Sequence, residues 1–202
     1  MRFLLFTLLG LTVFSCQQES KVQPLPYLGQ HEINGQDTVY HTIPDFAFVD
    51  QDSNLVTNAT FEGKIYLADF FFISCPTICP KVKKQMLRIF DKYQGNDELM
   101  LLSHTIDPKR DTVGRLKSYA QNLGVDNGQW RFVTGEMDEI YGIADDYMSI
   151  AKEDPNAPGG FDHSGWILLI DKTGHIRSFA DGTAPEKVDR LLTDIEWLLA
   201  NE

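Results

Sequence analysis

The sequence predicts an α/β protein whose central mixed β-sheet is flanked by helices, with a β-rich extension on its N-terminal side. Apolar runs of strand length alternate with amphipathic segments of helical period along the chain. The apolar run that begins at Tyr66 contains Phe70, Phe71 and Phe72 in succession, which is typical of a strand buried on both faces. This strand leads into Cys75 and Cys79, and α/β proteins place their chemistry at the carboxyl ends of such strands.

The elements around this strand follow from their local patterns. Residues 38–48 alternate loosely between apolar and polar and are broken by Pro44, which indicates short strands and turns. After the cysteines, apolar residues recur at helical spacing over residues 81–93, and Gly95 ends that helix. Residues 99–106 are a second apolar strand. A strand, a helix and a further strand therefore follow one another around the cysteines.

The second half of the chain continues the alternation. One apolar face predicts a helix over residues 113–123, capped by Asp111 or Thr112 and ended by Gly124. Residues 153–162 are rich in Pro and Gly and predict a mobile loop. The remaining predicted elements are a strand at 130–134, a helix at 136–147, a strand at 166–170, a hairpin turn at 171–174 and a final helix begun by Pro185. This order fits a thioredoxin-like fold.

Length and charge exclude some classes of function. A chain of 202 residues is expected to form one folded domain with a substantial core. Its net charge is −11, and removing the first segment, whose only charged residue is Arg2, leaves −12. Because affinity for nucleic acid rests on neutralising phosphates, we expect no nucleic-acid partner.

The N-terminus has the pattern of a secretory signal. Arg2 precedes an apolar run over residues 3–14, which is shorter than the roughly 20 residues of a transmembrane helix. Residues 13–16 resemble a bacterial lipobox, in which Cys16 becomes the lipidated first residue of the mature protein. An ordinary signal peptide containing a cysteine, or an uncleaved anchor, is the alternative.

These signals define the expected organisation of the chain. We expect residues 1–15 to be a lipoprotein signal peptide, residues 17–35 a linker and residues 36–202 the folded domain. A lipid at Cys16 would hold the protein on the extracytoplasmic, periplasmic side of a bacterial membrane. Cys75 and Cys79 then remain, and a single pair is more typical of a reactive site than of a disulfide framework.

The spacing of Cys75 and Cys79 allows two kinds of chemistry. Residues four apart at a helix start share one face, and Pro80 allows either a helix or a turn that precedes it. In both geometries the sulfurs lie near the positive end of a helix, which favours thiolates. The pair is therefore a redox dithiol or part of a metal site. Thioredoxin-type redox motifs have one residue fewer between the cysteines, whereas two thiolates and an imidazole suit Cu(I) and Cu(II).

Further residues are candidates for the same site. His163 follows the predicted loop and begins a strand at the edge of the sheet expected to face the cysteines, although a hydrogen-bonded loop histidine has the same pattern. His104 ends a strand at this edge and is a weaker candidate for a ligand or supporting group. Asp107 is a candidate for a carboxylate that supports the ligands, and otherwise is a turn residue. Asp162 is a candidate for a carboxylate that orients His163, and otherwise is a solvated residue.

The motifs together resemble those of the Sco/SenC copper proteins, which assist assembly of cytochrome c oxidase. The resemblance extends from about Ile43 to the C-terminal helix. Its carriers are the segment around Cys75 and Cys79, the run Thr105-Ile-Asp-Pro-Lys-Arg-Asp-Thr112, the run Trp130-Arg-Phe-Val-Thr-Gly135, and Asp162-His163-Ser164. Together these motifs are specific, although each alone is weak. One departure is His104, where a smaller residue is expected.

The resemblance implies a thioredoxin-like fold, and copper ligands at Cys75, Cys79 and His163. It also implies a role in delivering copper to the CuA centre of oxidase subunit II, or in reducing the cysteines of that subunit. Two hypotheses follow: a membrane-tethered copper chaperone, which is a binding and transfer protein, and an extracytoplasmic thiol–disulfide oxidoreductase that uses Cys75 and Cys79.

Overall fold

The computed structural model describes residues 24–125 and 127–202. The expected signal peptide, the lipidation site Cys16 and the first part of the expected linker lie outside the described residues. Within the described ranges, strands and helices alternate in the predicted order, and none of the helices is long and apolar enough to cross a membrane. The predicted mixed sheet flanked by helices is confirmed.

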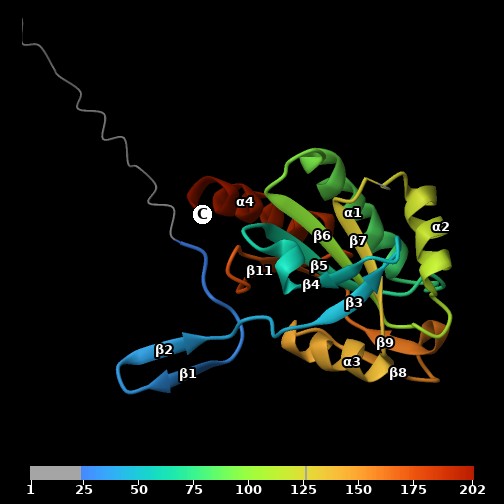
Figure 1. Cartoon of the computed structure of the whole chain (residues 1–202), viewed down its shortest axis with the longest axis horizontal. Coiled ribbons are helices and arrows are strands. Elements are labelled where there is room, and N and C mark those ends of the chain that lie inside the picture. The colour runs from blue at the N-terminus through green and yellow to red at the C-terminus, as the bar shows by residue number, and fades with distance from the viewer. Residues whose placement is uncertain (1–23, 126) are drawn as a thin grey trace, which may run out of the picture.

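A seven-stranded mixed sheet forms the centre of the molecule (Figure 1). Its strands are β3 (Ala47–Asp50), β4 (Leu55–Thr57), β5 (Ile65–Phe71), β6 (Leu99–Thr105), β7 (Trp130–Thr134), β10 (Trp166–Ile170) and β11 (Ile176–Asp181). Their order across the sheet is β11-β10-β5-β6-β7-β3-β4. The three central neighbours β5, β6 and β7 are parallel, and the pairs on either side are antiparallel. Every residue of β5 is buried, as its aromatic run predicts.

Four helices in the described part of the chain cover the two faces of this sheet. They are α1 (Cys79–Tyr93), α2 (Val113–Leu123), α3 (Met137–Asp146) and α4 (Pro185–Asn201). Helices α1, α2 and α4 lie on one face and α3 on the other (Figure 1). The alternation of side chains along β5 explains the contacts: Phe71 stacks on Tyr119 of α2 with ring centroids 5.6 Å apart, whereas Phe70 meets Tyr147, which follows α3.

Two short antiparallel ribbons lie outside the main sheet. The first pairs β1 (His31–Asn34) with β2 (Asp37–Tyr40) and projects from the body of the molecule (Figure 1). Its first strand lies within residues 17–35, the range predicted from the sequence to be a linker.

The second ribbon pairs β8 (Ala151–Glu153) with β9 (Phe161–His163), and we call it the histidine ribbon because it ends in His163. A short 3₁₀ helix, Pro158–Gly160, lies between its strands. The predicted loop at residues 153–162 is thus confirmed for residues 154–160, but its first residue ends β8 and its last two belong to β9, and His163 ends a strand instead of beginning one. Three-residue strands are too short to give a periodic signal in the sequence.

Candidate metal centre

The loop after β5 and the start of α1 position the two cysteines. Helix α1 begins at Cys79, and Pro80 occupies its first turn, where the missing N–H costs no hydrogen bond. Cys75 lies before the helix, and its N–H donates to the carbonyl of Phe72 at 3.2 Å. Of the two geometries that the sequence allows, the structure therefore has the turn that precedes the helix. Both cysteines are buried free thiols.

The histidine ribbon brings His163 onto these sulfurs. The His163 Nε2 atom lies 3.6 Å from the Sγ of Cys75 and 3.5 Å from the Sγ of Cys79. The other ring nitrogen, Nδ1, lies 3.3 Å from the carbonyl oxygen of Ser164. When Nδ1 carries the ring proton and donates it to this carbonyl, the Nε2 lone pair faces the two sulfurs and can bind a metal; when Nε2 carries the proton, the imidazole donates to Cys75 instead. Phe72 supports the imidazole edge-to-face, with ring centroids 5.4 Å apart.

The two thiols differ in acidity. Burial raises the pKa of Cys75, but hydrogen bonds from the backbone N–H groups of Thr77 and Cys79 and from His163 outweigh it and lower that pKa to about 6. Burial raises the pKa of Cys79 far above its usual range, although the charge of Lys83 opposes this rise. At neutral pH the metal-free site therefore holds its thiolate at Cys75.

The arrangement fits a metal ion. The three donor atoms lie within 4.8 Å of one another, and no other group of three such side chains converges in residues 24–125 and 127–202. Separations of 3.5–3.6 Å between sulfur and nitrogen suit a metal bonded at about 2.3 Å to sulfur and about 2.0 Å to nitrogen. Two thiolates and one imidazole offer soft and borderline donors, the set that copper accepts in both oxidation states. A closed zinc site would need a fourth protein ligand.

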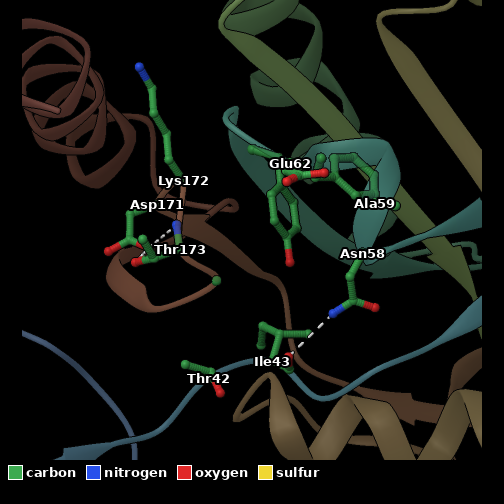
Figure 2. Close-up of a pocket in the computed structure, with 11 residues that line it drawn as sticks. Thr42, Ile43, Asn58, Ala59, Glu62, Asp171, Lys172 and Thr173 are labelled. Atoms are coloured by element: carbon green, nitrogen blue, oxygen red, sulfur yellow. Dashed lines mark hydrogen bonds between the residues drawn. The ribbon is translucent and has the colours of Figure 1, made fainter.

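A cavity of about 370 Å³ lies at the other end of β5 and is separate from this site (Figure 2). It lies between Asn58, whose side chain donates to the carbonyl of Ile43 at 3.4 Å, and the turn at Asp171 and Thr173. None of the three donor side chains lines it. The chemistry indicated by the sequence therefore belongs to the carboxyl end of β5.

Asp162 does not orient His163. Its carboxylate lies 3.5 Å from the Nζ of Lys152 across the histidine ribbon and is half-exposed. Adjacent residues of a strand point to opposite faces, so Asp162 points away when His163 faces the cysteines. The sequence interpretation of Asp162 as an orienting group is wrong, and the Ser164 carbonyl takes that place.

Asp107 lies buried in the loop after β6 and accepts a hydrogen bond from the Nε of Arg110. Arg110 in turn donates to the carbonyl of Gly159, at the tip of the histidine ribbon. Asp107 therefore reaches the segment that carries His163 through Arg110, and its own hydrogen bonds are to Thr105, Arg110 and Asp111.

His104 lies in an apolar part of the sheet. It is fully buried on β6, stacked on Phe70 at a centroid distance of 4.9 Å and enclosed by the rings of Phe46, Phe48 and Tyr147. Phe70 points to the α3 face, away from α1. The sequence prediction that His104 supports the metal site is therefore wrong, because its neighbours are core aromatic residues.

A buried polar cluster next to Cys79 is absent from the sequence predictions. Lys83 of α1 lies one helical turn after Cys79, and its Nζ is 3.3 Å from the carboxylate of Asp69 and 3.2 Å from the hydroxyl of Ser103. Trp130 donates to the same hydroxyl at 2.9 Å. Two signals were present in the sequence: a carboxylate in the middle of the apolar strand, and a lysine on the apolar face of the helix.

The fold and the site together define a thioredoxin-like protein with a Cys-Cys-His metal centre. The sequence profile of the SCO1/SenC family matches residues 34–200, and the chain belongs to this family. The fold that the sequence predicts is confirmed by this membership and by the solved structures that it resembles.

Three matches, one by sequence and two by structure, illustrate the similarity. The SCO1 protein homolog of Bacillus subtilis is 27% identical over 164 residues, which are 80% of this chain and 84% of that protein. BsSco, a member of the Sco family of cytochrome c oxidase assembly proteins in which a disulfide switch has been identified, is 26% identical with a TM-score of 0.70, over 80% of this chain and 95% of that one. The copper-bound ScoI of Bradyrhizobium japonicum is 25% identical with a TM-score of 0.62, over 78% and 99% respectively.

Proposed function

We propose that this protein binds copper through Cys75, Cys79 and His163 and acts as a copper chaperone in the assembly of the CuA centre of cytochrome c oxidase. The observation that carries the proposal is the convergence of two sulfurs and one imidazole nitrogen within 4.8 Å. The recipient is oxidase subunit II or another copper protein. Relatives described as copper-bound or as oxidase assembly proteins support this assignment.

The protein's own residues suit transfer better than permanent storage. Among the residues that the structure describes, three side chains converge, which leaves a position where a ligand of the recipient can bind the metal. His163 is half-buried, and it lies on a ribbon that is not hydrogen-bonded into the main sheet. A recipient can therefore displace one ligand without opening the sheet.

The proposal includes a tether outside the cytoplasm. A lipid on Cys16, followed by the linker, would hold the domain at the surface of a bacterial membrane. The lipobox-like residues 13–16 and the signal pattern before them support this part of the proposal. Mass spectrometry of the mature protein tests it: a diacylated N-terminal cysteine is expected, and an unmodified chain that begins elsewhere contradicts it.

The second candidate function is thiol–disulfide exchange, which the low pKa of Cys75, about 6, favours. The Cys75 thiolate would attack a disulfide of the partner and form a mixed disulfide. Cys79 would then displace the partner's sulfur, leaving the partner as a dithiol and the protein with a disulfide between Cys75 and Cys79. His163 separates the two functions, because copper binding needs a third ligand and thiol exchange does not.

Copper titration of the reduced protein and its His163→Ala variant tests the proposal. We expect the parent to bind one copper with a sulfur-to-copper charge-transfer band, and the variant to lose the band and at least tenfold in affinity. A His175→Ala variant is the control, since His175 lies at the β10–β11 turn against Thr173. If parent and His163→Ala bind copper equally poorly and both reduce a protein disulfide, the oxidoreductase takes the place of the chaperone.

A further inference from the structure

The histidine ribbon needs an attachment to the rest of the protein. Its strands have three residues each, and it forms a sheet of its own. Isolated two-stranded ribbons are marginally stable in water. At its base, the N–H of Ser164 donates to the carbonyl of Ile150 at 3.1 Å, and the N–H of Ile150 donates to the Ser164 hydroxyl at 3.2 Å. These bonds close the base but leave the tip to other contacts.

The ring of Phe72 packs against the tip of the histidine ribbon. Phe161 of β9 packs on it with ring centroids 5.0 Å apart, and His163 meets the same ring at 5.4 Å. Gly159 lies so close that a Cβ atom there would come within 2.8 Å of this ring, and its φ of +79° favours glycine. The position of the imidazole therefore depends on how the tip sits on Phe72.

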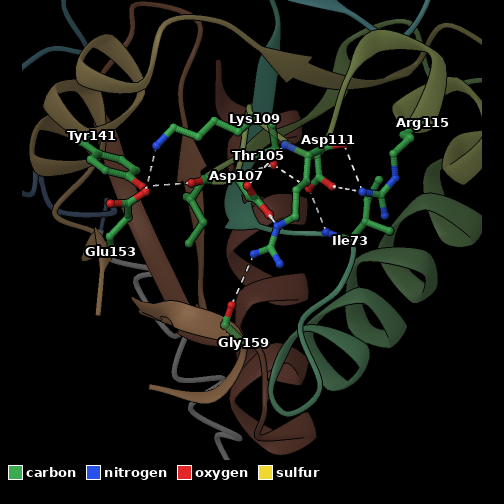
Figure 3. Close-up of polar contacts among 11 residues, drawn as sticks. Ile73, Thr105, Asp107, Lys109, Asp111, Arg115, Tyr141, Glu153 and Gly159 are labelled. Carbon is green, nitrogen blue, oxygen red and sulfur yellow. Dashed lines mark hydrogen bonds and ion pairs between the residues drawn. The ribbon is translucent and has the colours of Figure 1, made fainter. Parts of the chain in front are cut away.

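Arg110 ties this tip to the loop after β6. Its Nε donates to the buried carboxylate of Asp107, and its Nη2 donates to the carbonyl of Gly159 at 3.3 Å. The guanidinium carbon lies 5.5 Å from the centroid of Phe161. Figure 3 shows the hydrogen bonds around Asp107 and Gly159. One planar group thus binds a fixed carboxylate, the ribbon backbone and a ribbon ring at once, which a lysine ammonium cannot do.

We propose that Arg110 is the positioning residue for His163: it holds the histidine ribbon down on Phe72 and so keeps the third ligand over Cys75 and Cys79. The part that concerns copper rests on the proposed function. The neighbouring Lys109 also reaches the ribbon, 3.3 Å from Glu153, but both side chains are more than half exposed. Such a surface pair contributes little, so Lys109 is a matched control on the same loop.

The first measurement is amide hydrogen exchange of the reduced, copper-free protein. We expect Arg110→Met to raise the exchange rate of residues 151–163 about tenfold, Arg110→Lys to give an intermediate increase, and Lys109→Met to stay within twofold of the parent. This arm requires no metal, and Arg110→Lys decides it if Arg110→Met fails to fold. Ribbon exchange equal to the parent in both Arg110 variants overturns the proposal.

The second measurement is a double-mutant cycle on copper affinity. We expect Arg110→Met to weaken binding about tenfold and to reduce the nitrogen signature in the spectrum of bound Cu(II), whereas it has no further effect on affinity when combined with His163→Ala. An equal loss in both backgrounds overturns the proposal, because Arg110 would then act on the cysteines or on general stability. Failure of the parent to bind copper counts against the proposed function alone, since the exchange measurement still decides the role of Arg110.

Discussion

His104 shows how a single buried residue can set the response of the whole protein to acid. Both of its ring nitrogens lack a hydrogen-bond partner in the part of the chain that the structure describes. Burial among aromatic rings lowers its pKa from 6.5 to about 3. The folded protein therefore holds a neutral imidazole over a pH range in which the unfolded chain takes up a proton.

This difference predicts acid-dependent stability. The contribution of His104 is fully present above the unfolded pKa of 6.5 and is lost as the pH falls toward 3, by up to about 1.4 kcal/mol per pH unit. A His104→Leu variant has nothing to protonate, so between pH 7 and pH 5 it should lose about 1–2 kcal/mol less stability than the parent. Urea unfolding at both pH values measures this, with the exposed His31→Gln as control. Parallel pH profiles for the parent and His104→Leu would contradict the prediction.

Sequence reasoning identified the donor atoms of the site but not their surroundings. Cys75, Cys79 and His163 stand out because their side chains bind metals and lie where strands end. Asp162 and His104 share both features in the sequence, yet neither belongs to the site. The direction of a side chain across a three-residue strand, or the face of β6 on which a histidine lies, depends on tertiary packing that no local pattern encodes.

At the scale of elements, α1 joins the metal site to the sheet through Lys83. The ammonium is buried between Asp69 and Ser103 and lies over the ring of Phe71, 4.4 Å from its centroid. Burial lowers the pKa of Lys83, and the carboxylate of Asp69 opposes this change. The helix thus places a buried cation one turn beyond Cys79, on the face of the helix that packs against the core.

Replacing one partner of the Lys83–Asp69 ion pair should lower the free energy of unfolding more than replacing both partners. Lys83→Met leaves the carboxylate of Asp69 buried without its cation and is expected to lower the free energy of unfolding by about 3–5 kcal/mol. The double variant Asp69→Asn/Lys83→Met removes both charges and should recover most of that loss. Denaturant unfolding at pH 7 measures both, and the exposed Lys84→Met is the control, expected within about 0.5 kcal/mol of the parent. A double variant less stable than Lys83→Met would contradict this account.

The elements that sequence reasoning recovered and those that it missed differ in length and burial. Helices such as α1 and α4 were predicted because their buried apolar residues recur at helical spacing over several turns. Strands such as β5 and β6 were predicted because they are continuous apolar runs of strand length. The histidine ribbon was not, because its short strands are set by Arg110, Phe72 and Gly159, residues far apart in the sequence.

At the scale of the whole molecule, the metal centre brings together two parts of the chain that are far apart in the sequence. The cysteines come from the β5–α1 connection, and the histidine comes from a segment more than 80 residues later. The sheet core between these parts holds the largest buried side chains, among them Trp130, Phe71, Phe90 and Phe132. Stability and ligand geometry therefore depend on the main sheet and on the histidine ribbon, and not on the ribbon formed by β1 and β2.

Replacing residues 32–39 by a short Gly-Ser turn tests this division. All eight residues of β1 and β2 are exposed, so we expect the melting temperature to stay within about 3 °C of the parent and copper binding to be unchanged. Ile195→Ala in α4 is the contrasting variant: its side chain is fully buried, and its loss should cost about 2–5 kcal/mol and several degrees. Differential scanning calorimetry of both variants measures the effect. If shortening the ribbon lowers the melting temperature as much as Ile195→Ala does, the ribbon unfolds together with the core and the prediction is wrong. The contacts that would couple them are the stack of Tyr27 on Tyr40 and the packing of Arg177 on Tyr27.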